Sequence, residues 1–151
     1  MGRAPELSYE IYIAATPKDV WRGLVDGEMT QKYVYGTRLD STLSRGARFA
    51  YVGEGGFEAV SGEILAAEPE HRLVMRWQAH WDEKVAKDRP SRVSYQLDSA
   101  GPEMTRLRLR HDEFESETAT YLGSADAWPW MMSSLKSLLE TGKPLPPAPT
   151  A

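Results

Sequence analysis

The sequence predicts an α+β fold in which a curved antiparallel sheet of about seven strands wraps around one long C-terminal helix. Three observations support this fold class. Short stretches with alternating apolar residues follow one another, between turn-like segments, over most of the chain. Two short helical segments interrupt this pattern after the first stretch. An apolar stripe at helical spacing occupies the C-terminal part.

The N-terminal elements are a strand and a pair of helices. Residues 7–13 alternate and are rich in Tyr and Ile, which is typical of a strand. Thr16 and Pro17 mark a helix start, because threonine can cap free N–H groups and proline suits the first helical position. Asp26-Gly27 ends this helix, and a second short helix is expected over 29–34.

The middle of the chain reads as a succession of strands. The turns between them are rich in Gly, Pro and charged residues, as in 53-GEGG-56 and 68-EPEH-71. Such spacing favours an antiparallel meander. The expected strands are 46–52, 57–67, 72–81, 92–97 and 104–111, with a weaker one at 37–43.

The C-terminal helix is predicted from an apolar stripe with steps of three and four residues. Pro129 removes one helical hydrogen bond and clashes with the Ala125 carbonyl, so it either bends this helix or begins a new helical segment. Residues 6–142 are expected to form one domain, and the Pro-rich residues 143–151 an extended or disordered tail. The stripe consists of Tyr121, Ala125, Trp128, Met132, Leu135 and Leu139.

Composition excludes several classes of function. With a net charge of −4 and a pI near 5.4, the chain is not expected to bind nucleic acid or an anionic membrane surface. It has no cysteine, so disulfides and thiolate chemistry are excluded. No signal peptide or membrane-spanning stretch is recognisable, and we expect a cytoplasmic protein. No cofactor or metal motif is present.

Several motifs occur in a familiar order along the predicted domain. They are Thr16-Pro17 with Val20-Trp21, Asp26 to Tyr33, Glu68-Pro69 to Trp77, and Trp128 with Leu135-Lys136 and Leu139 to Gly142. In these motifs the chain resembles the family named after the activator of the heat-shock chaperone's ATPase. In its order of elements it resembles the helix-grip fold of the START-like (SRPBCC) superfamily, which includes the birch-pollen allergen and the polyketide cyclases.

The resemblance implies a cavity between the concave face of the sheet and the long helix. Strand alternation assigns side chains to this face, and the arginines at 106, 108 and 110 to the opposite one. For each inward residue taken alone, packing in a solid core is the simpler interpretation. The candidate ligand-binding residues are Trp21, Tyr33, Phe49, Met75, Trp77, Tyr95, Leu107, Leu109, His111, Tyr121, Ala125, Trp128 and Met132.

Little in the sequence indicates catalysis. No catalytic residue is assigned, and no assembled nucleophile or metal site is recognisable. His111 is the one histidine on a predicted inward face, which makes it the candidate acid or base, although a hydrogen-bonded structural histidine is the more common explanation of such a residue.

The sequence therefore predicts a protein that binds a small apolar or amphipathic molecule and catalyses nothing. The first alternative is an enzyme of the cyclase or hydrolase type with His111 as acid or base. The second, implied by the family resemblance, is a module that associates with a chaperone. Arg106, Arg108 and Arg110 form the candidate surface for a protein partner.

Overall fold

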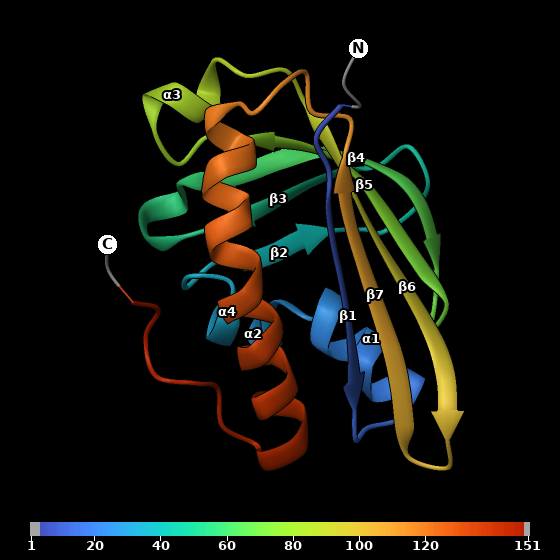
Figure 1. The fold of residues 1–151 in the computed structure, drawn as a ribbon. Coiled ribbons are helices and arrows are strands. Elements are labelled where there is room, and N and C mark those ends of the chain that lie inside the picture. The colour runs from blue at the N-terminus through green and yellow to red at the C-terminus, as the bar shows by residue number, and fades with distance from the viewer. Residues whose placement is uncertain (1–3, 150–151) are drawn as a thin grey trace.

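A seven-stranded antiparallel sheet, closed on one side by a long helix, forms the body of the computed structural model, which describes residues 4–149 (Figure 1). The elements, in chain order, are β1 (Leu7–Ile13), α1 (Pro17–Val25), α2 (Gly27–Tyr33), β2 (Arg38–Ser41), β3 (Arg48–Val52), the 3-10 turn η1 (Glu54–Gly56), β4 (Glu58–Glu68), β5 (Arg72–Ala79), α3 (Glu83–Ala86), β6 (Ser91–Gly101), β7 (Met104–Asp112) and α4 (Ala119–Thr141).

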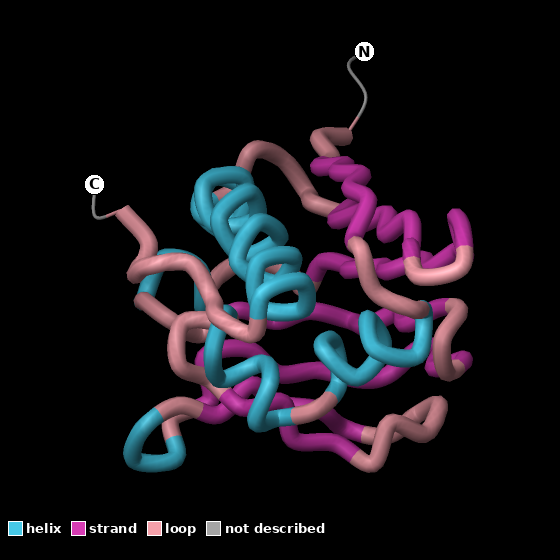
Figure 2. Tube along the Cα trace, turned by 90° about the horizontal axis from the view of Figure 1, so that it is seen from below, coloured by secondary structure: helices cyan, strands magenta, loops and turns pink. Residues whose placement is uncertain are grey.

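The strands lie in the order β1-β7-β6-β5-β4-β3-β2, so β2 to β7 form a meander and β1 adds to its far edge. All neighbours are antiparallel. Seen nearly along α4, the strands curve around the helix, and α1 and α2 lie near one end of the sheet (Figure 2). The predicted fold class is confirmed.

Alternation along β7 separates the two faces of the sheet as the sequence predicts. Leu107, Leu109 and His111 are fully or almost fully buried against the helix side. The arginines between them are partly or largely exposed on the convex face. An apolar inner face and a charged outer face are what an antiparallel sheet with one solvated side requires.

The helix pair forms where its capping residues place it. The Thr16 hydroxyl accepts a hydrogen bond from the Asp19 N–H at the start of α1. Asp26 ends α1 and its carboxylate accepts from the Glu28 N–H, so it also begins α2. One aspartate thus produces the abrupt turn between the two helices.

Helix α4 runs without interruption from Ala119 to Thr141 with Pro129 inside it, so the proline does not begin a new segment. Thr118 caps the helix, accepting from the Tyr121 N–H. Gly142 ends it with φ 83°, a left-handed conformation that glycine adopts at little cost. Among residues 4–149, no helix has both the length and the apolar character needed to cross a bilayer.

The chain after Gly142 turns and runs back beside α4, as the red segment in Figure 1 shows. The Leu145 N–H donates to the Ser134 hydroxyl at 3.0 Å, and the Trp130 indole N–H donates to the Pro146 carbonyl at 3.1 Å. The predicted tail is therefore non-helical, and it is hydrogen-bonded to the helix as far as Pro146. Residues 150–151 lie outside the described part.

Candidate functional site

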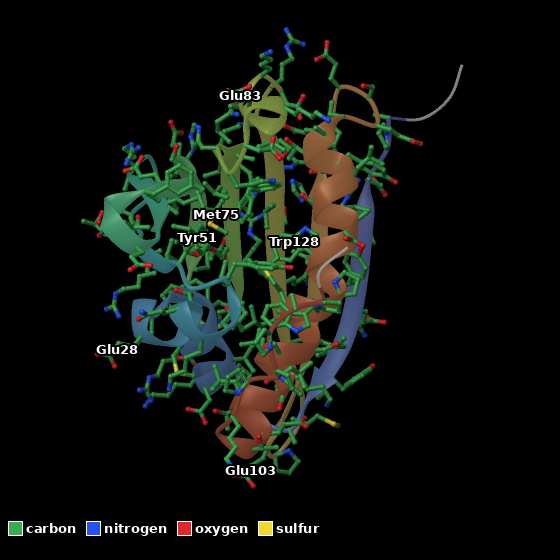
Figure 3. All side chains as sticks on the ribbon, turned by 90° about the vertical axis from the view of Figure 1, so that its left-hand side faces the viewer. Glu28, Tyr51, Met75, Glu83, Glu103 and Trp128 are labelled. Atoms are coloured by element: carbon green, nitrogen blue, oxygen red, sulfur yellow. The ribbon has the colours of Figure 1, made fainter. Side chains whose placement is uncertain are left out.

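A cavity of about 370 Å³ lies between one end of the sheet and the N-terminal half of α4. Tyr51 from β3 and Trp128 from α4 both lie in the space between sheet and helix, together with Met75 of β5 (Figure 3). Nearly all of the lining is apolar, and no lining side chain is charged. The lining residues are Val34, Tyr35, Thr37, Tyr51, Ala59, Val60, Trp77, Trp81, Gly123, Ser124, Ala127, Trp128 and Met131.

Aromatic rings from neighbouring strands make up the sheet side of this cavity. Tyr51 and Trp77 are buried, with ring centroids 5.4 Å apart, and Phe49 packs behind them, 6.2 Å from Trp77. Gly62 makes room for this cluster. A Cβ at Gly62 would lie 1.8 Å from the Arg76 carbonyl oxygen and 3.1 Å from the Phe49 ring, so no larger residue fits there.

One face of α4 forms the opposite side. Ser124, Ala127, Trp128 and Met131 follow one another at steps of three, one and three, which brings them onto the same side of the helix. The Trp128 indole spans the gap to the sheet, with its ring centroid 5.7 Å from that of Trp77. The two tryptophans therefore join helix and sheet at the edge of the cavity.

The connection between β5 and β6 covers part of the cavity. Trp81, which is 40% exposed, packs so closely on α4 that a Cβ at Gly123 would lie 3.2 Å from its ring. The Asp88 carboxylate accepts hydrogen bonds from the backbone N–H and the hydroxyl of Thr120, at 2.8 and 2.7 Å. The connection is thereby fastened to the first turn of α4, and the absence of a side chain at position 123 lets Trp81 pack closely against the helix.

His111 lies behind the cavity, fully buried and bonded through both ring nitrogens. The Trp128 indole N–H donates to Nδ1 at 3.0 Å. Because an indole can only donate, the neutral ring carries its proton on Nε2, which donates to the Ser91 hydroxyl at 2.7 Å. Burial lowers the pKa of His111 to about 3, although the Asp112 carboxylate acts in the opposite direction. The ring is neutral at pH 7.

Two of the thirteen residues expected from the sequence, Trp77 and Trp128, line the cavity. Tyr121, Ala125 and Trp21 are half-buried side chains that pack against the core. The others are buried in the core without lining the cavity: Tyr33, Phe49, Met75, Tyr95, Leu107, Leu109, His111 and Met132. The side chains expected around one large cavity therefore divide between a solid core and a smaller cavity at one end. Whether any of them binds a ligand stays a prediction.

Sequence reasoning missed most of the lining. The predicted apolar stripe of α4 includes Tyr121, Ala125 and Met132, whereas the cavity is lined by the adjacent face with Ser124, Ala127 and Met131. Both faces have helical spacing, and periodicity alone does not say which one meets a cavity. Trp81 and Gly123 could have been recognised from the sequence. A tryptophan just beyond a strand and a glycine within a helix are both unusual, and each indicates a packing requirement at its position.

The convex face of the sheet carries arginines that are paired with nearby carboxylates. Arg108 contacts Asp98 at 2.8 Å, and Arg110 contacts Glu6 at 2.9 Å and Asp112 at 3.2 Å. Arg106 lies 2.8 Å from Glu10, although the angle is not that of a hydrogen bond. Within residues 4–149, no cluster of three or more side chains of metal-binding type is found.

Comparison with known proteins places this geometry in a family. The model of the family "Activator of Hsp90 ATPase homolog 1-like protein" matches residues 14–140. The chain belongs to this family. The match extends from the end of β1 to the last turn of α4 and includes every lining residue. No curated protein matches the chain.

Solved structures repeat the fold over most of the chain. Protein MLL2253 from Mesorhizobium loti is 27% identical, with a TM-score of 0.73, covering 89% of this chain and 96% of that one. The Aha1 dimer from Colwellia psychrerythraea is 19% identical, with a TM-score of 0.73 and coverages of 92% and 98%. PFC0360w, an Hsp90 activator from Plasmodium falciparum, is 19% identical, with a TM-score of 0.66 and coverages of 82% and 86%.

Proposed function

We propose that this family member binds a small, largely apolar molecule in the cavity between β3–β5 and α4. The observation that carries the proposal is a 370 Å³ space whose lining is nearly all apolar and carries no charge. Its volume falls in the range of small-molecule sites, which are concave and mostly apolar with a few polar groups. A ligand there would gain free energy mainly by removing apolar surface from water.

The state of His111 favours binding over catalysis. A general base works best with a pKa near the operating pH and a free lone pair. The pKa of His111 is lowered to about 3, and its Nδ1 lone pair is already used by the Trp128 indole. Nor does His111 line the cavity. These features describe a histidine that holds helix and sheet together.

Titration with the neutral fluorescent probe N-phenyl-1-naphthylamine, together with displacement by a panel of lipophilic and aromatic compounds, tests the proposal. We expect saturable binding with at least one compound at roughly micromolar affinity, or about −8 kcal/mol. Trp77 and Trp128 lie in the wall, so their fluorescence should change on binding.

A pair of variants at one lining position tests whether the probe binds in the cavity. Ala127→Leu adds a larger side chain to the lining, and Ala127→Ser keeps the residue small at the same position. Binding that is lost in Ala127→Leu and kept in Ala127→Ser supports the cavity as the site. Equal binding by both variants would place the probe elsewhere on the protein.

Family membership supports a second candidate function, association with the chaperone Hsp90. The Colwellia and Plasmodium proteins described above share the fold. Adding the purified protein to Hsp90 and measuring ATP hydrolysis tests this candidate. A dose-dependent rise in the rate would support it, and an unchanged rate would count against it.

A further inference from the structure

Polar groups without a hydrogen-bond partner lie in and behind the wall of the apolar cavity. The Trp77 indole Nε1 is buried and has no hydrogen-bond partner within residues 4–149. An indole nitrogen can only donate, so it needs an acceptor, and leaving it unpaired in an apolar interior costs stability. Two other polar groups of the same wall are satisfied: Trp128 donates to His111, and the Thr37 hydroxyl donates to the Val34 carbonyl at 2.6 Å.

Two hydroxyl groups lie in the same lining. Tyr51 comes from β3, with its ring centroid 5.4 Å from that of Trp77, and Ser124 comes from the facing side of α4. Both residues are buried, and neither hydroxyl is hydrogen-bonded to any of the described residues. Burial raises the pKa of Tyr51 well above its usual value, so this hydroxyl keeps its proton and can donate.

The lining carries no charge, and this limits which ligands can bind beside these donors. No lysine, arginine or histidine lines the cavity. A carboxylate or phosphate there would lose its hydration without gaining a counter-ion, which is strongly unfavourable. An uncharged oxygen atom with free lone pairs would lose much less hydration free energy on binding, and it would accept hydrogen bonds from the donors.

We propose that the ligand is a neutral, mostly apolar molecule with a carbonyl oxygen, which accepts a hydrogen bond from the Tyr51 hydroxyl. This inference rests on the proposed function, since it specifies the ligand class of the same cavity. The carbonyl lies at the sheet side, and the apolar remainder of the ligand packs against Ala127 and Met131 of α4.

A matched pair of probes isolates the carbonyl. Fluorene and 9-fluorenone have the same tricyclic shape. Fluorene has a CH₂ group where 9-fluorenone has a C=O group. Their dissociation constants are measured by equilibrium dialysis, together with that of the anionic fluorene-9-carboxylate. For the wild-type protein we expect 9-fluorenone to bind about fivefold more tightly than fluorene, as one neutral hydrogen bond allows. The carboxylate should bind at least tenfold more weakly than 9-fluorenone.

Two tyrosine variants test the donor. Tyr51→Phe keeps the ring and removes the hydroxyl. This variant should therefore bind 9-fluorenone and fluorene about equally tightly, with an unchanged affinity for fluorene. Tyr33→Phe is the control, because Tyr33 is equally buried but lies outside the lining and donates to the Gly23 carbonyl at 2.7 Å. It should keep the fivefold preference.

The outcomes separate this inference from the proposed function. Equal binding of fluorene and 9-fluorenone, a preference that Tyr51→Phe leaves unchanged, or tightest binding of the carboxylate would each overturn the inference and leave cavity binding in place. If neither tricyclic compound binds although N-phenyl-1-naphthylamine does, the inference also fails. If none of these compounds binds, the proposed function fails with it.

Discussion

At the residue scale, His111 shows how its surroundings decide the role of a titratable group. Its ring is buried among aromatic side chains, 4.4 Å from Phe114 and 5.8 Å from Trp77, measured between ring centroids. Both nitrogens are bonded, one to the helix and one to the sheet. His111 is a candidate acid or base in the sequence because of its inward position. The same position removes the ring from the water with which an acid or base exchanges its proton.

This burial predicts a specific loss of stability in acid. The pKa of His111 is about 3 in the folded protein, against 6.5 for an ordinary histidine, so below pH 6.5 the unfolded chain takes up a proton that the folded chain refuses. The free energy of unfolding should therefore fall as the pH falls, by about 2 kcal/mol between pH 7 and pH 5 on this account.

Urea denaturation at pH 7, 6 and 5 checks this prediction. His111→Gln removes the titrating group, so its stability should change less over this range than that of the wild type. His71→Gln is the control, because His71 is exposed in the turn between β4 and β5. The same pH dependence in the wild type and in His111→Gln would contradict the prediction.

At the element scale, α4 has two parts with different neighbours. Its N-terminal half faces the cavity through Ser124, Ala127 and Trp128. Its C-terminal half packs on α1, where a Cβ at Gly23 would lie 3.0 Å from Leu135 and 3.3 Å from Leu139. The helix is therefore held firmly at one end and adjoins an open space at the other.

Truncations along this helix should differ accordingly. Leu135 is fully buried, so Leu135→Ala should lower the free energy of unfolding by about 2 to 5 kcal/mol. Leu139→Ala should cost less, because Leu139 is only partly buried. Leu122→Ala, at a side chain that is 57% exposed, should change stability by about 0.5 kcal/mol or less. Chemical denaturation of the three variants measures these values, and an equal loss at all three positions would refute this division of the helix.

The elements were predictable because their signals are local. Alternation located the strands within a few residues, and Thr16 and Asp26 fixed the helix pair through their own side-chain caps. The cavity was not predictable in detail. Whether Phe49 or Tyr51 reaches it depends on the curvature of the sheet, and Trp81 reaches it through a loop anchored by Asp88. Such packing is set by contacts between segments far apart in the sequence, which periodicity does not record.

At the scale of the whole molecule, charge is distributed so that the convex sheet face is nearly neutral. Arg106, Arg108 and Arg110 each contact at least one carboxylate. Within an acidic chain with a net charge of −4, this face offers little free positive charge to a polyanion.

Replacing these three arginines with glutamine should therefore have small effects. Their side chains are 35% to 55% exposed, and exposed ion pairs contribute about 0 to 1 kcal/mol each. The free energy of unfolding, measured in urea, should fall only slightly. Gel-shift assays with duplex DNA at physiological salt should show no binding before or after the change, and binding that the substitution abolishes would reverse this view of the face.

The pairing of β1 with β7 also bears on how the protein is made. Leu7 lies opposite His111 and Ile13 opposite Thr105, so the first strand finds its partner only after most of the chain has left the ribosome. Until then β1 exposes an apolar face and an unpaired backbone edge. Closing so long a loop is slow, and exposed strand edges promote aggregation. Synthesis of this protein should therefore be most vulnerable in the interval before β7 emerges, when a chaperone that shields the N-terminal strand would raise the yield of folded chains.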